Sequence, residues 1–310
     1  MIQVDQLTKH FGSVVALDGL SFSVLPGHVT GFLGPNGAGK TTTMRIILGL
    51  NDPTSGSALV DGRRYEGIIR PLYEVGSLLD ANALHPGRSA WHHLLWIAQS
   101  NGIGQRRVSE VMALTGLEDV ARRRVKGFSL GMKQRLGIAA ALLGDPPTLV
   151  FDEPANGLDP EGILWIRELF KKLANEGRTV FVSSHLMSEM ALSADHLVII
   201  GRGKVLADAP TEQFVEGNAH SDVLVRSPQA NELATKLKAV GAVVVDESSD
   251  AIAVTGLEAA TIADLAAGLG IAVHELSPRH ASLERAYLDI TRDSIEFKAG
   301  ETAQKGSADQ

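Results

Sequence analysis

The chain has 310 residues, of which 44% are hydrophobic and 21% charged, values that are ordinary for a globular protein. No apolar stretch approaches the roughly 18 residues needed to cross a bilayer, and no leader-like segment opens the sequence, so a membrane role would require a separate partner. The absence of cysteine excludes disulfides, thiolate metal sites and cysteine nucleophiles, and fits a reducing cytoplasm.

The net charge of −7 is unevenly distributed. Residues 216–310 contain 8 Lys and Arg against 15 Asp and Glu, whereas residues 1–215 hold 21 of each sign. A protein that binds nucleic acid usually carries a basic surplus on some part of its chain. We therefore expect no nucleic-acid partner.

The first 60 residues show short apolar runs typical of strands. They are expected at residues 2–7, 14–18, 20–24 and 29–33, with a turn at Pro26-Gly27 before the last. Residues 42–50 carry apolar side chains at helical spacing. Residues 57–60, followed by Asp61-Gly62, predict a hairpin.

The middle of the chain changes from a helical to an alternating pattern. Between about residues 80 and 145, helices are expected at 91–98, 107–115 and 133–143. Strand-like runs return at 149–151, 179–182 and 196–200, the last followed by a turn at 201–203. Strands separated by helices predict a mainly parallel sheet covered on both faces, into which the helical block is inserted as a subdomain.

Composition shifts near residues 216–218, and a second pattern follows. It predicts a strand at 222–226, a helix at 232–240, strands at 243–247 and 251–255, a helix at 259–269 and a strand at 272–276. This βαββαβ order is typical of a small ferredoxin-like domain. A last helix is expected at 282–290. We therefore predict one domain over 1–215, a smaller α+β domain over 216–296, and a disordered tail over 297–310.

The sequence from Gly34 to Thr42 is a complete phosphate-binding loop of the G-x-x-x-x-G-K-[ST] type. It consists of Gly34, Pro35, Asn36, Gly37, Ala38, Gly39, Lys40, Thr41 and Thr42. Its glycines allow successive backbone N–H groups to cradle phosphate oxygens. Lys40 can reach the β- and γ-phosphates, and the Thr41 hydroxyl can ligate Mg²⁺. A strand before it and a helix after it complete an anion site, whereas an accidental glycine-rich turn would lack both flanks.

An apolar strand at 148–151 ends in two carboxylates, Asp152 and Glu153. Ligands of open α/β sheets bind at such strand ends. Asp152 suits the shell of the same Mg²⁺ as Thr41, and Glu153, turned differently by the strand pleat, can face an attacking water. The alternative is a solvated acidic strand end. Upstream, Ser129 precedes an alanine-rich helix, where a simple N-cap is the alternative to a ligand contact.

With these motifs in this order, the chain resembles the nucleotide-binding subunit of an ABC transporter over about residues 1–215. Residues 34–42 resemble the Walker A motif, 129–135 the signature and 149–153 Walker B. Residues 156–160, with Asp159, resemble the D-loop, and His185 the switch histidine. Phe11 stands where the family often stacks an aromatic ring on adenine, although it is equally typical of a packing residue.

The resemblance implies a P-loop ATPase fold of ABC type, with a mainly parallel core sheet, an antiparallel N-terminal β-subdomain and a helical subdomain. It also implies that ATP and Mg²⁺ are the cofactors. Two copies would enclose two ATP molecules head to tail, with Ser129 and Gly131 of one copy closing over the ATP on the other. In this scheme Glu153 polarises water, His185 steadies the γ-phosphate and Lys40 neutralises charge.

Two departures from the family pattern indicate which branch of the family the chain resembles. Leu130-Gly131-Met132 replaces the usual paired glycines and glutamine of the signature, and Asp80 stands near the position of the Q-loop glutamine. Asp80 is thereby a further candidate for the metal site. Both departures resemble the drug- and antibiotic-export branch that pairs with ABC-2-type permeases. This implies an exporter subunit at the cytoplasmic face of the membrane, with residues 80–89 facing the permease.

Other functions remain open from sequence alone. One is a soluble ABC-type ATPase in DNA repair or translation, which usually has a coiled-coil insertion, a second cassette or a basic surface. Another is a nucleotide-dependent regulatory module whose C-terminal domain binds a small ligand. The cluster of Trp91, His92, His93 and Trp96 predicts either a helix face for packing or, with further ligands, a metal or aromatic site.

Overall fold

The computed structural model describes residues 1–185, 187–218, 222–279 and 283–291. These residues form two compact units, one of residues 1–211 with 290–291 and the other of Glu212–Asp289. Within the described part of the chain, no helix combines the length and the apolar character that a membrane span requires. The expected tail at 297–310 lies outside the described residues.

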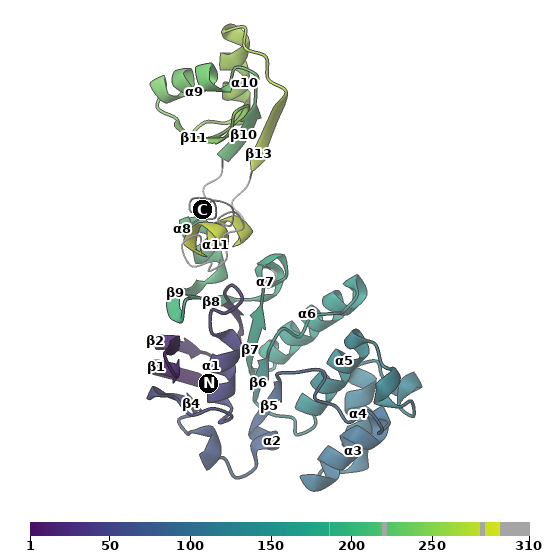
Figure 1. Ribbon diagram of the computed structural model, residues 1–310. Coiled ribbons are helices and arrows are strands. Elements are labelled where there is room, and N and C mark those ends of the chain that lie inside the picture. The colour runs from purple at the N-terminus through teal and green to yellow at the C-terminus, as the bar shows by residue number, and fades with distance from the viewer. Residues whose placement is uncertain (186, 219–221, 280–282, 292–310) are drawn as a thin grey trace, which may run out of the picture. The chain divides into compact units, whose positions relative to one another are not determined.

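The first unit contains two sheets, seen in Figure 1. A three-stranded antiparallel sheet has the order β2-β1-β4, formed by β2 (Val14–Val24), β1 (Ile2–Phe11) and β4 (Ser55–Val60). A six-stranded sheet has the order β5-β6-β7-β3-β8-β9, formed by β5 (Val75–Leu78), β6 (Thr148–Phe151), β7 (Thr179–Ser184), β3 (Val29–Leu33), β8 (His196–Gly201) and β9 (Lys204–Pro210). Its first five strands are parallel, and β9 returns antiparallel to β8. The predicted mainly parallel core is confirmed.

The register of the core sheet brings three strand ends together. Leu33 of β3 is opposite Ser184 of β7, and Phe151 of β6 is opposite Val182 of the same strand. The segments that follow these strands therefore leave the sheet along one edge, which is where open α/β sheets bind ligands.

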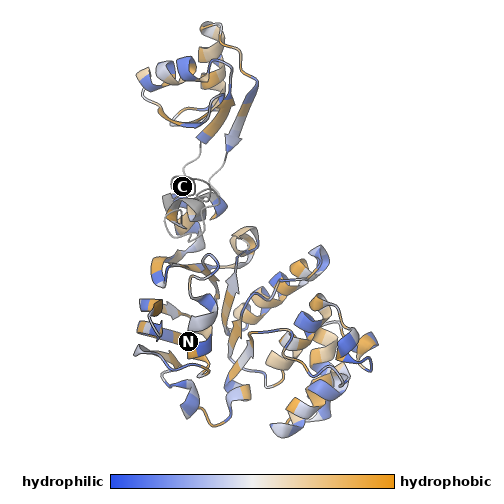
Figure 2. Ribbon diagram, viewed as in Figure 1, coloured by the Kyte–Doolittle hydropathy of each residue, from blue (hydrophilic) through white to orange (hydrophobic). Residues whose placement is uncertain are grey.

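Aromatic packing joins the two sheets. The rings of Phe22, Phe32 and Phe181 have centroids 5.1–5.8 Å apart, and all three are buried. Because β3 and β7 are buried throughout, their apolar residues run continuously rather than alternating. Figure 2 shows β7 as mostly hydrophobic.

The helices of the first unit lie around the core sheet and in a separate group. They are α1 (Lys40–Ile47), α2 (Pro71–Glu74), α3 (Ala90–Ser100), α4 (Gln105–Leu114), α5 (Leu130–Ala141), α6 (Pro160–Asn175) and α7 (Met187–Ser193), with short 3₁₀ turns at Tyr65–Gly67, Glu118–Val120 and Val125–Gly127. In Figure 1, α3, α4 and α5 form one group, and α5 contacts the edge strand β5.

Several predicted bounds were wrong. The two strands expected at 14–18 and 20–24 form one continuous strand, β2. Its pairing with β1 changes register between Leu7↔Leu20 and Lys9↔Leu17, and this irregularity accommodates the residues between the two expected strands. Helix α5 begins at Leu130 rather than 133, because Ser129 caps it. The turn at Asp61-Gly62 is present, with positive φ at both residues, but it leads only to a single bridge between Val60 and Arg63.

The second unit contains a four-stranded antiparallel sheet in the order β11-β12-β10-β13. Its elements are β10 (Asp222–Arg226), α9 (Ala230–Ala239), β11 (Val243–Ser248), β12 (Ala251–Thr255), α10 (Ala259–Gly268) and β13 (Glu275–Arg279), with α8 (Thr211–Asn218) before them and α11 (Leu283–Thr291) after them. The predicted βαββαβ order is confirmed. Val223 and Ile252 from the sheet share one core with Leu233 of α9 and Ile262 of α10, so both helices cover the same face.

The last strand of this sheet begins later than predicted. Residues 272–276 were expected, whereas β13 starts at Glu275 and pairs with β10 from Glu275↔Arg226 to Arg279↔Asp222. Ile271, the apolar residue that precedes the expected strand, is buried in the core shared with α9 and α10 instead. Pro278 is tolerated in β13 because this strand lies at the edge of the sheet.

Candidate functional site

The loop between β3 and α1 has a backbone that only glycine fits at several positions. A Cβ atom on Gly34 would lie 2.5 Å from the carbonyl oxygen of Ile200, and one on Gly39 would lie 2.5 Å from Cδ2 of Leu17. Gly37 and Gly39 also have positive φ angles of 82° and 107°. The glycines therefore allow the loop to turn tightly into the N-terminus of α1, which is the geometry of an anion cradle.

Lys40, the first residue of α1, is buried within this loop. Its Nζ donates a hydrogen bond of 2.6 Å to the carbonyl oxygen of Gly34 and lies 3.8 Å from Oε1 of Glu153. Burial lowers the pKa of the Lys40 ammonium group, and the carboxylates of Glu153 and Asp152 oppose that shift. A cation thus lies at the base of the loop.

A chain of hydrogen bonds links α1, β6 and β7. The Thr41 hydroxyl donates a bond of 2.6 Å to Oδ2 of Asp152, and the Ser183 hydroxyl donates to Oδ1 of the same carboxylate. Hydroxyl and carboxylate oxygens are the ligands that Mg²⁺ prefers, alongside phosphate oxygens. Thr41 and Asp152 therefore fit a magnesium ion held together with a bound triphosphate.

Glu153 has a left-handed backbone, with φ of 48°, which is uncommon outside glycine. Its N–H donates to Ser183 Oγ at 2.9 Å, and its Oε2 lies 2.6 Å from Nδ1 of His185 and accepts from the His185 N–H at 3.3 Å. The carboxylate is therefore held between β7 and the loop. Its side chain is 22% exposed, which leaves it accessible to a small molecule such as water.

These groups border one cleft of about 250 Å³. It is lined by residues 35–42, by Asp152 and Glu153, and by Ala16 of β2. The structure thus brings together the predicted phosphate loop and both predicted carboxylates. His185 reaches this group through Glu153.

Phe11 and Asp80 do not line this cleft. Phe11 ends β1 and is 48% exposed, with Nζ of Lys9 at 5.0 Å from its ring centroid. Asp80 is exposed, and its Oδ1 accepts a hydrogen bond of 2.8 Å from the N–H of Asn82. In this conformation the Asp80 carboxylate stabilises its own loop.

The predicted signature and D-loop residues form a separate group at the N-termini of α5 and α6. Ser129 Oγ accepts from the Met132 N–H at 3.2 Å, and Asp159 Oδ1 accepts from the Gly162 N–H at 2.9 Å, so both residues are N-caps. Gly131 packs closely on Gly157, because a Cβ atom at residue 131 would lie 2.8 Å from the Gly157 carbonyl oxygen. Neither Ser129 nor Gly131 lines the cleft of its own chain.

Three residues at or near the carboxylates have no role predicted from the sequence. Ala16 lines the cleft, Ser183 contacts both Asp152 and Glu153, and Gln134 donates to the backbone of Glu153. Ser183 could have been suspected from its place at the end of a buried strand. Gln134 lies within the predicted signature segment, but only the folded chain brings it to the backbone of Glu153, just as only the folded chain places Ala16 at the cleft.

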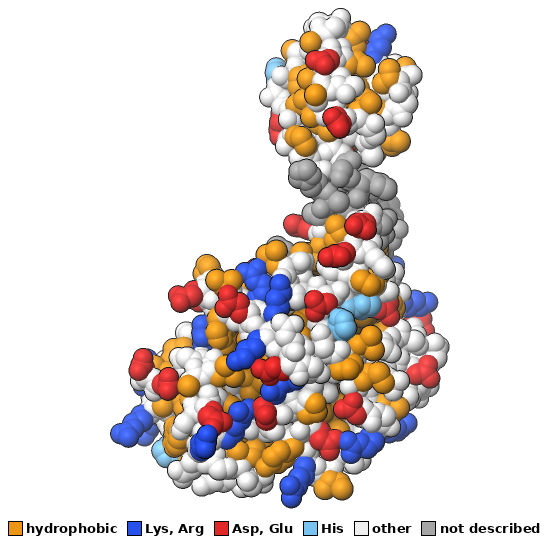
Figure 3. Space-filling model, turned by 180° about the vertical axis from the view of Figure 1, so that it is seen from behind, with side chains coloured by type: hydrophobic (Ala, Val, Ile, Leu, Met, Phe, Trp, Pro, Cys, Tyr) orange, Lys and Arg blue, Asp and Glu red, His pale blue; other side chains and the backbone are white. Residues whose placement is uncertain are grey.

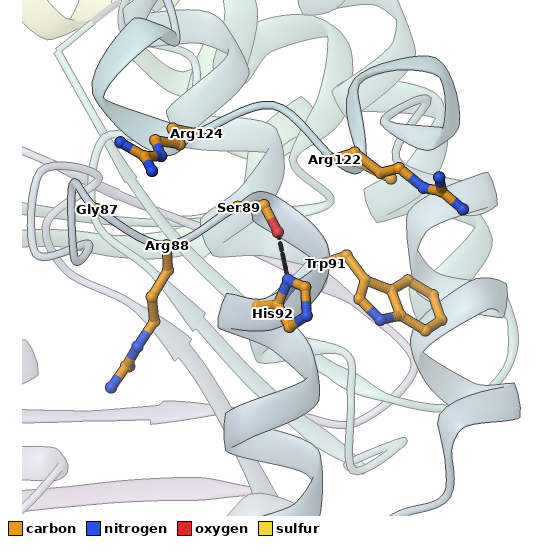
Figure 4. Close-up of a pocket in the computed structure, with 8 residues that line it drawn as sticks. Gly87, Arg88, Ser89, Trp91, His92, Arg122 and Arg124 are labelled. Carbon is orange, nitrogen blue, oxygen red and sulfur yellow. Dashed lines mark hydrogen bonds between the residues drawn. The ribbon is translucent and has the colours of Figure 1, made fainter.

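A second, larger cavity of about 910 Å³ lies in the helical region (Figure 4). It is lined by Gly87, Arg88, Ser89, Trp91, His92, Ala121, Arg122 and Arg124. Ser89 Oγ and His92 Nδ1 lie 2.8 Å apart, and the Arg88 guanidinium stacks on the Trp96 ring at 4.3 Å. His93 is buried away from solvent. Among the described residues, no three His, Asp or Glu side chains are grouped to hold a metal.

Comparison with known proteins gives a consistent result. A family model described as ABC transporter matches residues 17–156, and one described as a domain of unknown function (DUF8746) matches residues 221–284. The uncharacterized ABC transporter ATP-binding protein YhcH of Bacillus subtilis is 35% identical, over 96% of this chain and 97% of its own length. The bacitracin transport ATP-binding protein BcrA of Bacillus licheniformis is 42% identical, over 70% of this chain and 72% of its own. The lantibiotic transport ATP-binding protein SrtF of Streptococcus pyogenes is 38% identical, over 67% and 90%.

Solved structures agree with this fold. An ATP binding subunit of an ABC transporter superimposes with a TM-score of 0.64 at 27% identity, covering 70% of this chain and 92% of that one. The ATP-binding cassette MJ0796, solved as a dimer in a post-hydrolysis state bound to ADP and Pi, gives a TM-score of 0.62 at 25% identity, covering 68% and 99%.

Proposed function

The chain belongs to the ATP-binding proteins of the ABC transporter family and is an ATPase, and from this premise we propose that it powers export of an antibiotic or similar lipophilic compound through an ABC-2-type permease. The site supports ATP hydrolysis, because Lys40, Thr41, Asp152 and Glu153 meet at one cleft. The proposed class of cargo is supported by relatives named for bacitracin and lantibiotic transport. These names also favour transport over a role in DNA repair or translation.

The residues of the cleft have different roles in ATP hydrolysis. Backbone N–H groups of residues 34–42 bind the phosphates, and Lys40 contributes a fixed positive charge. Thr41 and Asp152 would hold Mg²⁺, which when bound neutralises charge on the transferred phosphoryl group. Glu153 orients and polarises the attacking water through its carboxylate, and His185 fixes that carboxylate through the 2.6 Å contact with Oε2.

A second copy completes the site in this proposal. Ser129 and Gly131 lie at the N-terminus of α5, whose unsatisfied N–H groups favour negative charge. Since neither residue lines the cleft of its own chain, they are free to face a γ-phosphate bound by the partner. Support comes from the dimeric arrangement of the similar cassette MJ0796.

We further propose that the ATPase domain covers residues 1–215 and the accessory domain 216–296, and that the protein acts at the cytoplasmic face of the membrane. The cavity of Figure 4 is the proposed docking site of the permease. Arg88, Arg122 and Arg124 line this cavity together with Trp91, which suits a cytoplasmic loop carrying carboxylates and an apolar side chain. Figure 3 shows, in contrast, charges of both signs interspersed over the visible face of the first unit.

The substitution Glu153→Gln tests the site. It preserves shape and removes the negative charge that polarises water, so turnover should fall at least about 100-fold while ATP binding persists. Dimers should then accumulate in ATP, detected by light scattering. Glu168→Gln, an exposed change on α6, is the matched control. Hydrolysis at the normal rate by the Glu153→Gln protein would exclude Glu153 as the water-polarising group.

A further inference from the structure

Gln134 is a buried polar side chain to which the proposed mechanism gives no role. It lies in the second turn of α5 and is only 5% exposed. Its Nε2 donates hydrogen bonds of 3.3 Å each to the carbonyl oxygens of Glu153 and Asn156. Because both partners are carbonyl oxygens, the amide NH₂ group must face them, which fixes the orientation of the side chain.

The other end of this amide lacks a partner. Within the part of the chain that the structure describes, Gln134 Oε1 is buried and accepts no hydrogen bond. An unsatisfied buried acceptor costs about 1–3 kcal/mol. An apolar residue of the same size would avoid that cost, so a glutamine at this position is explained by what its NH₂ group holds rather than by stability.

What it holds is the backbone of the glutamate with a left-handed conformation. The Glu153 N–H is bound by Ser183 Oγ at 2.9 Å, and its carbonyl oxygen accepts from Gln134 and from the Asn156 N–H at 3.2 Å. A φ of 48° at a non-glycine residue persists only where surrounding contacts impose it. Hydrogen bonds on both sides of residue 153 therefore set the direction in which its carboxylate leaves the backbone.

The same side chain connects this backbone to the helix that begins at the signature segment. Gln134 lies five residues after Ser129, the N-cap of α5. The preceding residue of the same helix, Lys133, donates a hydrogen bond from Nζ to Asn82 Oδ1 at 3.0 Å. At the start of α5, Gly131 packs on Gly157, which follows Asn156 in the D-loop. A displacement of α5 therefore reaches residue 153 through the Gln134 amide.

We propose that Gln134 is a positioning residue that holds the Glu153 carboxylate in its hydrolytic orientation and couples that orientation to α5. The inference rests on the proposed function, in which Glu153 polarises water and the N-terminus of α5 faces the partner's nucleotide. Nucleotide bound between two copies would then press on α5 of one copy and adjust the glutamate in the cleft of that same copy.

The test is Gln134→Met, which keeps the length and volume of the side chain and removes both donors. We expect kcat for ATP hydrolysis to fall at least about tenfold, because small misplacement of a reacting group is costly. KM for ATP and the protein concentration at half-maximal activity should stay within about twofold of wild type. Thr115→Val, which removes a buried helix hydrogen bond in the same subdomain, is the control for general destabilisation and should retain wild-type kcat.

A double-mutant cycle separates this inference from the proposed function. In the Glu153→Gln background, adding Gln134→Met should not lower the residual single-turnover rate further, because both changes act on one group. ATP-dependent dimers should still form.

If Glu153→Gln abolishes turnover but Gln134→Met hydrolyses ATP at the wild-type rate, or if the two losses multiply, the inference is wrong and the proposed function stands. Full turnover by Glu153→Gln alone would instead overturn the catalytic role that the proposed function gives to Glu153. Should Gln134→Met lower the melting temperature by more than Thr115→Val, Gln134→Leu provides a second apolar variant for the same cycle.

Discussion

Nζ of Lys40 lies 3.8 Å from Oε1 of Glu153, although the two residues are separated by more than a hundred positions in the chain. The ammonium group also donates to the Gly34 carbonyl oxygen at 2.6 Å. The cation of the phosphate loop and the carboxylate at the end of β6 thus face the same small space. This relationship depends on the parallel pairing of β6, β7 and β3, which ends all three strands at one edge.

Lys40→Ala should weaken ATP binding itself. The substitution removes a charge-assisted donor to the phosphates, which is worth about 1.5–3 kcal/mol, so the Kd for MgATP should rise at least about tenfold. Isothermal titration calorimetry measures the change directly. Lys171→Ala, which removes an exposed lysine from α6, is the control and should bind as wild type does. An unchanged Kd for Lys40→Ala would show that the loop is not part of the nucleotide site.

Much of the fold followed from local patterns in the sequence. Strands β3, β6, β7 and β8 were predicted because they are short apolar runs bounded by turns, and all four are confirmed. Helix α6 (Pro160–Asn175) was not singled out, although Asp159 caps it and Pro160 occupies its first position. Figure 2 shows hydrophobic and hydrophilic residues mixed along this helix, a pattern that a longer window would have detected.

Other parts of the fold and the site could not be predicted locally. Strand β5 (Val75–Leu78) is four residues long and contains a glycine and a serine, so its strand character depends on pairing with β6. The contacts of Ser183 and Gln134 with residue 153 cross 30 and 19 positions of sequence, respectively. Such pairs arise from the packing of α5 and β7 and have no signature within one segment. The phosphate loop was predictable because a single segment supplies all of it.

Gly76→Ala should destabilise the first unit. A Cβ atom at this position of β5 would lie 2.1 Å from the carbonyl oxygen of Ala141 and 2.9 Å from Cδ2 of Leu149. Because a backbone carbonyl at the end of α5 cannot move away without shifting the helix, we expect a loss of about 1–3 kcal/mol. Urea denaturation followed by circular dichroism measures it.

Gly67→Ala is the matched control for this substitution. A Cβ atom on Gly67 would meet no atom within 4 Å, and its backbone lies outside the left-handed region. The control should therefore change stability by less than about 0.5 kcal/mol. Equal stability of the two alanine variants would contradict the close packing of α5 on β5.

His93→Phe should reduce the loss of stability at mildly acidic pH. His93 is buried, its Nδ1 has no hydrogen-bond partner among the described residues, and burial lowers its pKa below the ordinary value of 6.5, aided by the nearby charges of Arg88 and His85. The unfolded chain therefore binds a proton at a higher pH than the folded chain does. The associated stability is fully present above pH 6.5 and is lost as the pH falls through the lower pKa of the folded state, with a slope of at most about 1.4 kcal/mol per pH unit.

Phenylalanine does not titrate, so the His93→Phe variant should lose less stability than wild type between pH 7 and pH 5. Melting temperatures measured across this range provide the comparison. His92→Phe, which replaces an exposed imidazole on the same helix, is the control and should follow the wild-type curve. Because the phosphate loop lies outside α3, nucleotide affinity at pH 7.5 should be the same in all three proteins. Parallel curves for wild type and His93→Phe would show that the buried imidazole does not determine acid sensitivity.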